Sequence, residues 1–329
     1  MERIRHAVLV QTDRNSAIVL SRDESFTVAT DGSFDLSRAW ALLKQGASSG
    51  EVAVTIGCDV GAIESFVAAL RDVGLWIEVG ADREVVSVVS ALETLNAAVT
   101  MWKRHSVIHP IFRLLEDEQR RSSLLISLMV EVCHFTAQTP RIGCVAAAYA
   151  SSSDGRRRLL LHAADEQDHY IDLTRAVGKA LSVDGRDILS SQPAIATTLI
   201  CSYLEHLARN HVPAYAACLQ FLEADPGVAE KAHDAFTSLA TKNDVPVAVA
   251  QAFARHSRED MLAGHASVGP AVIAAEFPSG IPAVAMDEML NAVHTLKHSF
   301  DSLYDALSTE WADPAQSYLL RGAVRADMI

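Results

Sequence analysis

The chain has 329 residues, half of them hydrophobic, so it can bury a large core, and its length favours two domains or one large domain with an appendage. A formal net charge of -13 argues against a nucleic-acid partner, because such binding depends on Lys and Arg neutralising phosphates. No apolar run approaches the length of a membrane span, and the N-terminal sequence lacks the pattern of a signal peptide, so we expect a cytoplasmic protein. Five cysteines without a CxxC pair indicate reduced thiols.

Residues 1–82 predict a small α+β domain. Short β-prone runs at 7–11, 16–20 and 25–30 predict a sheet. Three short helices are expected next, over 35–46, 48–57 and 59–74, with Asp35 capping the first and Ser48 and Glu51 forming a capping box on the second. A final strand is expected at 75–79. This order of elements is typical of a winged-helix unit.

The sequence "GCDVGAIESFVAALRDVGLW" (57–76) closes this unit, which resembles the PqqD-like peptide-recognition modules of ribosomal-peptide modifying systems. The resemblance implies that a leader peptide or partner protein adds a strand at a sheet edge. DNA binding is disfavoured, because residues 1–84 hold 8 basic and 13 acidic side chains. A domain that only packs against its neighbour is the remaining alternative.

Almost every segment after the joint "GADREV" (80–85) has helical period, with prolines near the boundaries between segments. We expect a helical domain over 84–311 and a C-terminal tail over 312–329. The expected helices span 84–105, 110–120, 122–150 with a break near Pro140, 155–181, 194–224 with a break near Pro213, 227–241, 246–268 and 284–310.

Several of these helices direct carboxylates and imidazoles toward the core, where such groups are costly unless they are paired or bind a metal. The candidates are Glu131 with His134; His162, Glu166 and His169; Glu223; and His256 with Asp260. The two ExxH pairs, "EVCH" and "EQDH", suggest a ferritin-like di-iron bundle. Chain order argues against that fold, because a Glu helix should separate the two ExxH helices.

A second resemblance covers residues 100–311. Its motifs are "RHSVIHPIFRLL", "LLLHAADEQDHYIDLTRAVGKAL", "YLEHLARNHVPAYAACLQFLEA" and "FARHSREDMLAGH". Together they resemble the heme-oxygenase-like superfamily, which includes thiaminase II, pyrroloquinoline-quinone synthase and di-iron oxidases. The resemblance implies a mainly α fold, a heme-oxygenase-like helical bundle preceded by the small winged-helix-like domain.

The resemblance also implies metal ligands. Glu166 and His169 match the family's E/H ligands, Glu223 matches the bridging carboxylate, and His256 and Asp260 match the first two ligands of HxxxDxxH.

The third position of that motif is Ala263, and His265, two residues later, should lie well round a continuous helix. Three outcomes stay open. In the first, iron binds at one firm site through Glu166, His169 and His256, and Glu223 and Asp260 hold a labile second ion whose site His162 or His265 completes. In the second, there is a single iron site only. In the third, the protein has lost the metal.

Other polar groups have plainer interpretations. Glu131 and His134 are more typical of a hydrogen-bonded core pair than of ligands, with pocket lining as the alternative. His294, His298 and Asp301 have helical ligand spacing, but a solvated or packed face is favoured there. Thiaminase-like chemistry would need a nucleophilic cysteine, for which Cys133 and Cys144 are candidates.

The sequence therefore favours a non-haem Fe(II) enzyme, with one or two ions, that uses O2 as co-substrate. It would oxidise a small amine, an amino acid or a peptide-borne residue in natural-product or ribosomal-peptide modification. The alternatives are a metal-free binding or partner protein and a cofactorless oxidase. A homodimer is compatible with each of these functions, since dimers are the commonest oligomers.

Overall fold

The computed structural model describes residues 2–4, 8–11, 16–20, 25–30, 32–72, 76–78, 85–117, 121–223, 226–318 and 320–321. The chain divides into two compact units, Met1–Ala98 with Ser279–Asn291, and Val99–Pro278 with Ala292–Ile329. The expected joint at 80–85 lies outside the described residues except for Val85.

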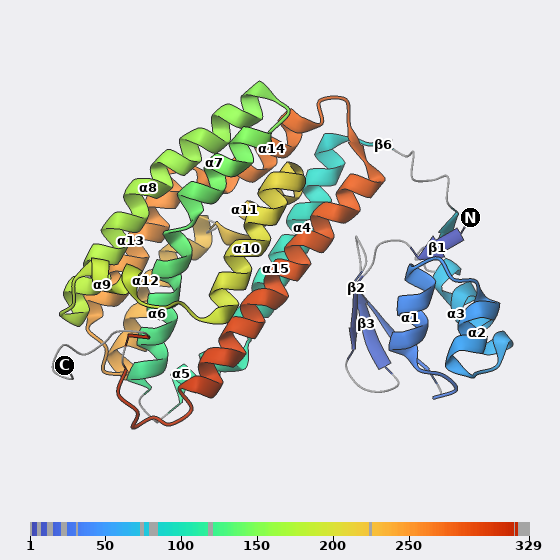
Figure 1. Ribbon diagram of the computed structural model, residues 1–329, viewed down its shortest axis with the longest axis horizontal. Coiled ribbons are helices and arrows are strands. Elements are labelled where there is room, and N and C mark those ends of the chain that lie inside the picture. The colour runs from blue at the N-terminus through green and yellow to red at the C-terminus, as the bar shows by residue number, and fades with distance from the viewer. Residues whose placement is uncertain are drawn as a thin grey trace. The chain divides into compact units, whose positions relative to one another are not determined.

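The first unit combines short strands with three helices (Figure 1). Its elements are β1 (Glu2–Ile4), β2 (Val8–Gln11), β3 (Ser16–Leu20), β4 (Ser25–Ala29), α1 (Leu36–Lys44), α2 (Ser49–Ile56), α3 (Val60–Asp72), β5 (Trp76–Glu78), β6 (Val85–Val86) and β7 (Ile281–Pro282). β2, β3 and β4 form an antiparallel sheet in that order, β1 pairs with β5, and β6 pairs with β7. The three expected strands, the three helices and the returning strand are confirmed. β1 was not expected, and its partner strand lies more than seventy residues along the chain.

The caps of α1 and α2 form as expected from the sequence. Asp35 accepts a hydrogen bond from Arg38 N at 3.0 Å, and Ser48 and Glu51 form a reciprocal capping box at the start of α2. These side chains satisfy backbone N–H groups that a helix leaves unpaired at its first turn. The inner faces of the helices then bury Leu36, Ala39, Trp40, Leu43, Val52, Ala53, Ile63, Phe66, Val67 and Leu70 in one core with Val19 of β3.

Helices make up most of the second unit. They are α4 (Val88–Val107, which begins in the first unit), α5 (Pro110–Glu116), α6 (Ser122–Thr136), α7 (Thr139–Tyr149), α8 (Ser153–Leu181), α9 (Gly185–Ser190), α10 (Ile195–Asn210), α11 (Val212–Leu222), α12 (Pro226–Lys242), α13 (Val247–Ala263), the 3-10 turn η2 (His265–Ser267), α14 (Val268–Glu276) and α15 (Ala283–Glu310, which also begins in the first unit). The expected breaks near Pro140 and Pro213 are confirmed. The separate helices α9 and α14 were missed.

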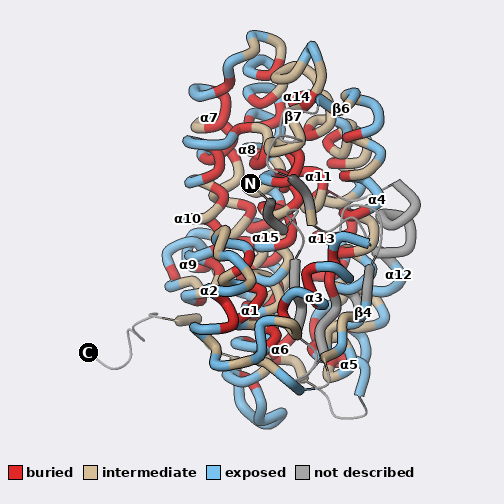
Figure 2. The backbone as a smooth tube through the Cα atoms, turned by 90° about the vertical axis from the view of Figure 1, so that its right-hand side faces the viewer, coloured by how far each residue is buried: buried red, intermediate tan, exposed pale blue. Residues whose placement is uncertain are grey.

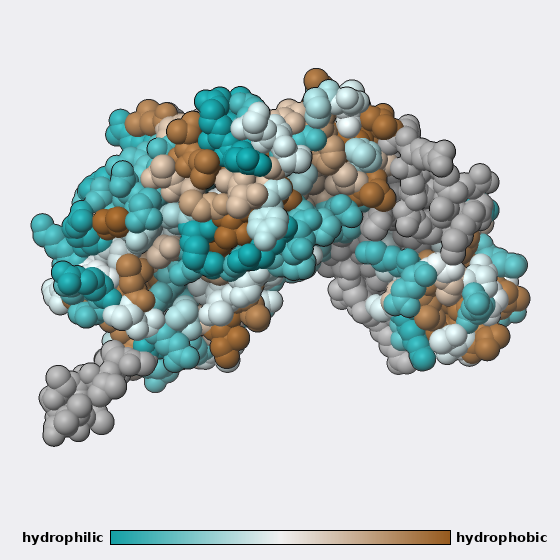
Figure 3. Space-filling model, turned by 45° about the horizontal axis from the view of Figure 1, so that its top comes forward, coloured by the Kyte–Doolittle hydropathy of each residue, from teal (hydrophilic) through white to brown (hydrophobic). Residues whose placement is uncertain are grey.

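Helix α8 lies at the centre of the packing and contacts α6, α7, α9, α13 and α14. Figure 2 shows the buried residues along the inward faces of the helices. α14 also packs closely on α11 at Gly269, where an added Cβ would lie 2.3 Å from Ala216 O. Glycine is therefore required at this crossing. The surface in Figure 3 carries small hydrophobic patches between hydrophilic side chains, as is normal for a folded chain in water.

A candidate metal centre

Helix α8 presents three potential ligands on one face. His162, Glu166 and His169 are spaced by four and three residues, so their side chains lie above one another on a helix. His162 and Glu166 are buried, with side chains 0% and 5% exposed. The helix itself is fixed by packing on five neighbouring helices, so these three side chains have a rigid support.

Helix α11 ends at Leu222, and Glu223 follows it directly. The backbone of Glu223 is extended as the C-cap of α11, and its carbonyl oxygen accepts a hydrogen bond from Lys103 Nζ at 2.8 Å. The buried Glu223 carboxylate is directed at α8, with Oε1 3.2 Å from His162 Nε2. Lys103 thus fixes the backbone of Glu223 while the side chain enters the centre.

The C-terminal end of α13 supplies Asp260 and, after a change of direction, His265. α13 stops at Ala263 because Gly264 adopts the left-handed conformation with φ 75°, and η2 follows. The expectation of one helix over 246–268, which placed His265 far round from Asp260, was wrong for this reason. The turn brings His265 Nδ1 to 3.4 Å from Asp260 Oδ1 and leaves Ala263 exposed.

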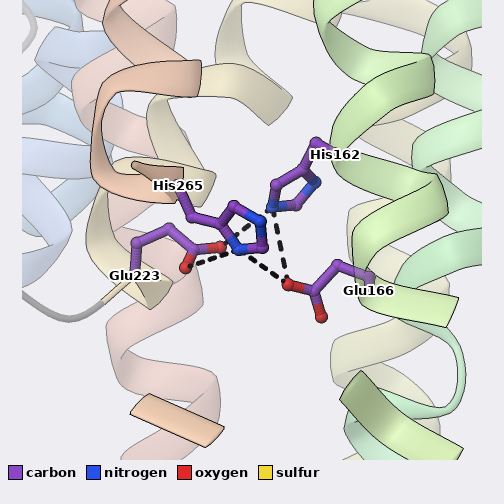
Figure 4. Close-up of side chains that lie close together, drawn as sticks. All are labelled: His162, Glu166, Glu223 and His265. Atoms are coloured by element: carbon purple, nitrogen blue, oxygen red, sulfur yellow. Dashed lines mark hydrogen bonds and ion pairs between the residues drawn. The ribbon is translucent and has the colours of Figure 1, made fainter. Parts of the chain in front are cut away.

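Four side chains from three segments meet in the first of two potential ligand groups (Figure 4). This first group consists of His162, Glu166, Glu223 and His265. His265 Nδ1 lies 3.1 Å from Glu166 Oε1 and 3.8 Å from Glu223 Oε2. All four residues are buried.

A second group overlaps the first and consists of Glu166, His169, Asp260 and His265. His169 Nδ1 lies 2.8 Å from Asp260 Oδ1. In each group one ligand atom per residue lies within 4.8 Å of the others. Glu166 and His265 are the residues shared between the groups, whereas Glu223, matched above to a bridging carboxylate, lies in the first group alone.

His256 stands beside the second group without belonging to either. Its Nε2 atom is 3.5 Å from Asp260 Oδ2, and its ring centre is 5.7 Å from that of His169. The sequence predicted His256 as a ligand of the firm iron site, whereas the structure places it at the edge of the second group.

The carboxylates of the centre stabilise positive charge on the neighbouring imidazoles. Burial alone would lower the pKa of His265, but the carboxylates of Asp260, Glu166 and Glu223 outweigh it and raise that pKa to about 10. Burial would raise the pKa of Asp260, yet His265, His256 and His169 lower it. Without another cation, a protonated His265 is therefore the charge that neutralises the surrounding carboxylates.

The donor set fits a metal ion. Among the described residues, three buried atoms that face the centre have no hydrogen-bond partner of good geometry: Nδ1 of His169, Nδ1 of His265 and Oδ1 of Asp260. Buried polar atoms are rarely left in this state unless a ligand is missing. Two imidazoles and two carboxylates in each group are the ligand types of non-haem iron and of carboxylate-bridged metal pairs.

Asp165 was not among the predicted site residues. It neighbours Glu166 on α8, is 53% exposed, and places Oδ2 3.6 Å from His265 Nε2, the ring nitrogen that faces away from the cluster. Histidine ligands commonly direct their second ring nitrogen at a carboxylate, which fixes the ring. The acid-rich sequence "ADEQD" was the available signal, but a contact with His265 could not be inferred while α13 was assumed to continue.

The structure gives Glu131 and His134 other partners. Glu131 accepts hydrogen bonds from Ala194 N and Thr197 Oγ1 and pairs with Arg321, and His134 Nε2 lies 3.0 Å from Ser191 Oγ. Neither residue belongs to the metal-capable groups. Each is a buried residue of the core that has its own hydrogen-bond partners.

The two candidate cysteines lie in different surroundings. Burial raises the pKa of the Cys133 thiol to about 12, so it stays protonated at neutral pH. Cys144 is exposed on α7. A cysteine mechanism of the thiaminase kind gains no support from these surroundings.

Comparison with known proteins rests on structure. No protein-family model matches the chain, and no curated protein matches it. A domain of unknown function with a heme oxygenase-like fold from Shewanella denitrificans superposes with a TM-score of 0.56 at 17% identity, covering 70% of this chain and 98% of that one. The helical part of this chain has a heme oxygenase-like fold. A TenA homologue from P. horikoshii superposes with a TM-score of 0.45 at 12% identity, over 66% of this chain and 97% of that one.

The expected mainly α, heme oxygenase-like architecture is thus confirmed. Among the helices of the described ranges, none is both long enough and apolar enough to cross a bilayer.

Proposed function

We propose that this protein is a non-haem iron enzyme that uses O2 to oxidise a small amine, an amino acid or a peptide-borne residue. The observation that carries the proposal is the pair of overlapping four-residue groups, which share Glu166 and His265 in the buried interior of the heme oxygenase-like unit. Fold alone does not give an activity, so the argument depends on this site.

The residues would divide between two metal positions. His162 and Glu223 would hold one ion and His169 and Asp260 the other, with Glu166 common to both groups. A single imidazole nitrogen binds one metal, so His265 Nδ1 would complete one position, and His256 is the nearest further imidazole beside Asp260. Iron(II) held here would supply electrons to O2.

The protein's own contribution is charge, protons and exclusion of water. The carboxylates would attract a divalent cation, and its binding would displace the proton that they hold on His265, because a metal requires the deprotonated ligand. The ligands of the first group are all buried, which keeps bulk water from the reacting groups.

The alternative of a metal-free binding protein drew its sequence support from Ala263. That support weakens because His265 reaches the cluster through the Gly264 turn, so the centre does not lack a nitrogen ligand.

The test is anaerobic loading with Fe(II), followed by removal of free iron, metal analysis and exposure to O2. Wild-type protein should retain iron and give an O2-dependent change in visible absorbance. Glu166→Ala should lose both, because it removes the carboxylate common to the two groups. Asp168→Ala, an exposed carboxylate two residues along α8, is the matched control and should behave as wild type. Wild-type protein that retains no iron would refute the proposal.

A second function is favoured by the first unit. β4 is an edge strand of its sheet among the described strands, and beside it runs a groove of about 540 Å³ between β4 and α3. Val28 and Phe34 line one side and Ala62, Phe66 and Ala69 the other. We propose that an extended peptide pairs with β4 and places apolar side chains in this groove.

A peptide-display selection with the full-length protein tests this second function. Ala69→Trp fills the groove from an exposed position and should abolish binding of the selected peptides. Val54→Trp adds the same ring to α2, where Val54 is 85% exposed, and should leave binding unchanged. Equal binding by both variants would place the peptide elsewhere.

A further inference from the structure

A histidine pair on α15 stands apart from the candidate centre. His294 and His298 are four residues apart on the helix, and neither belongs to the two metal-capable groups. Their Nε2 atoms lie 3.1 Å from each other, and their ring centres are 4.3 Å apart at an interplanar angle of 74°. The two ring nitrogens therefore face each other at hydrogen-bond distance.

We propose that His294 and His298 form a separate binding site for a divalent transition-metal ion of the zinc, copper or nickel type. Two imidazole nitrogens on one zinc ion would lie about 3.4 Å apart at a tetrahedral angle and about 2.9 Å apart at a right angle. The observed 3.1 Å falls between these values. Imidazole pairs suit these metals in preference to magnesium or calcium, which favour oxygen ligands.

The surroundings hold both rings in place. His294 is 6% exposed and packs edge-on against Trp102, with ring centres 5.4 Å apart. On His298, Nδ1 lies 3.5 Å from Asp301 Oδ2, so the carboxylate orients the ring and leaves Nε2 toward the metal position. This carboxylate, histidine and metal arrangement is common among histidine ligands.

Access to this site suits a cation. Asp301 is ion-paired with Lys297, so its carboxylate serves to orient His298 and its charge is already balanced. The His298 side chain is 46% exposed, so water can complete the coordination and the ion can enter from solvent. A shared proton between the two rings would give the same nitrogen separation, and the experiment below separates the two explanations.

The experiment is a zinc titration of full-length protein carrying Glu166→Ala and His265→Ala, which removes both residues shared by the candidate centre. This background should still bind one equivalent of zinc. Adding His298→Ala, at a half-exposed position, should abolish that equivalent. Adding His105→Ala instead, an exposed histidine on α4, should leave it unchanged.

Copper(II) gives a second measurement. Its electron paramagnetic resonance spectrum in the same background should show two imidazole nitrogens, and only one or none after His298→Ala. Equal zinc binding with and without His298, or no zinc bound by the background protein, would overturn the proposal. Because the two ligands shared by the candidate centre are absent throughout and only His298 is varied, this result is independent of the fate of the iron proposal.

Discussion

Gly264 decides whether His265 can reach the centre. Its φ of 75° lies in the left-handed region, and an added Cβ would meet only Ser267 Oγ, at 3.8 Å. The cost of Gly264→Ala is therefore conformational, about 1–2 kcal/mol in the free energy of unfolding. We expect this loss in urea denaturation of the metal-free protein, together with reduced iron retention. Gly50→Ala in α2, with open space around it and no positive φ, should not lower the stability. Equal effects of the two substitutions would contradict this role for the turn.

Asp165 should act on metal affinity through His265. Its carboxylate lies 3.6 Å from His265 Nε2 and is half exposed, so Asp165→Asn should leave the fold intact. Loss of a carboxylate behind a histidine ligand typically weakens metal binding about 10- to 100-fold. Competition with a chromophoric chelator measures this change. Asp168→Asn, on the same helix, is the control, and identical affinities of the two variants would show that Asp165 does not position His265.

At the scale of elements, one buried carboxylate helps to attach the C-terminal segment to the helical unit. Glu131 on α6 has a fully buried side chain and accepts hydrogen bonds from Ala194 N and Thr197 Oγ1. Arg321 supplies the positive charge from the segment after α15, and its carbonyl accepts a hydrogen bond from Gln192 N at 2.8 Å. The segment therefore closes over a group that would be costly to leave unpaired.

Removing this charge should destabilise the protein. Because two donors to Glu131 remain, we expect Arg321→Ala to cost about 2–3 kcal/mol, less than a fully orphaned buried charge. Chemical denaturation measures the change, and Arg186→Ala, at an exposed ion pair, should change the stability by less than about 0.5 kcal/mol. Combining Arg321→Ala with Glu131→Gln should cost less than the two single changes together, since the carboxylate charge is then absent. Strict additivity would mean that the pair does not interact.

The sequence predicted those features of the fold and the site that depend on residues close together in the chain. The face shared by His162, Glu166 and His169 follows from helical spacing, and the caps at Asp35 and Ser48 follow from short motifs. The end of α13 was missed because "LAGH" is compatible with a continuing helix, and the left-handed Gly264 is selected by tertiary packing around η2. β1 was missed for a similar reason, since it is three residues long and its partner is distant in the chain.

Across the whole molecule, every candidate ligand of the centre belongs to the second compact unit. A ligand that binds the native state alone stabilises it by mass action, and the effect is greatest where its contacts suppress local opening. Iron(II) should therefore slow amide hydrogen exchange in α8, at the end of α11 and around η2, because these segments carry Glu166, Glu223 and His265.

Mass spectrometry of peptides from the full-length protein, with and without Fe(II) under anaerobic conditions, measures this protection. Helices α1, α2 and α3 supply no candidate ligand and serve as the internal reference. Glu166→Ala should remove the metal-dependent protection in all three segments at once, because it takes away the carboxylate common to both groups. Protection confined to α8, or spread equally over α1–α3, would show that the ion does not bind where these segments meet.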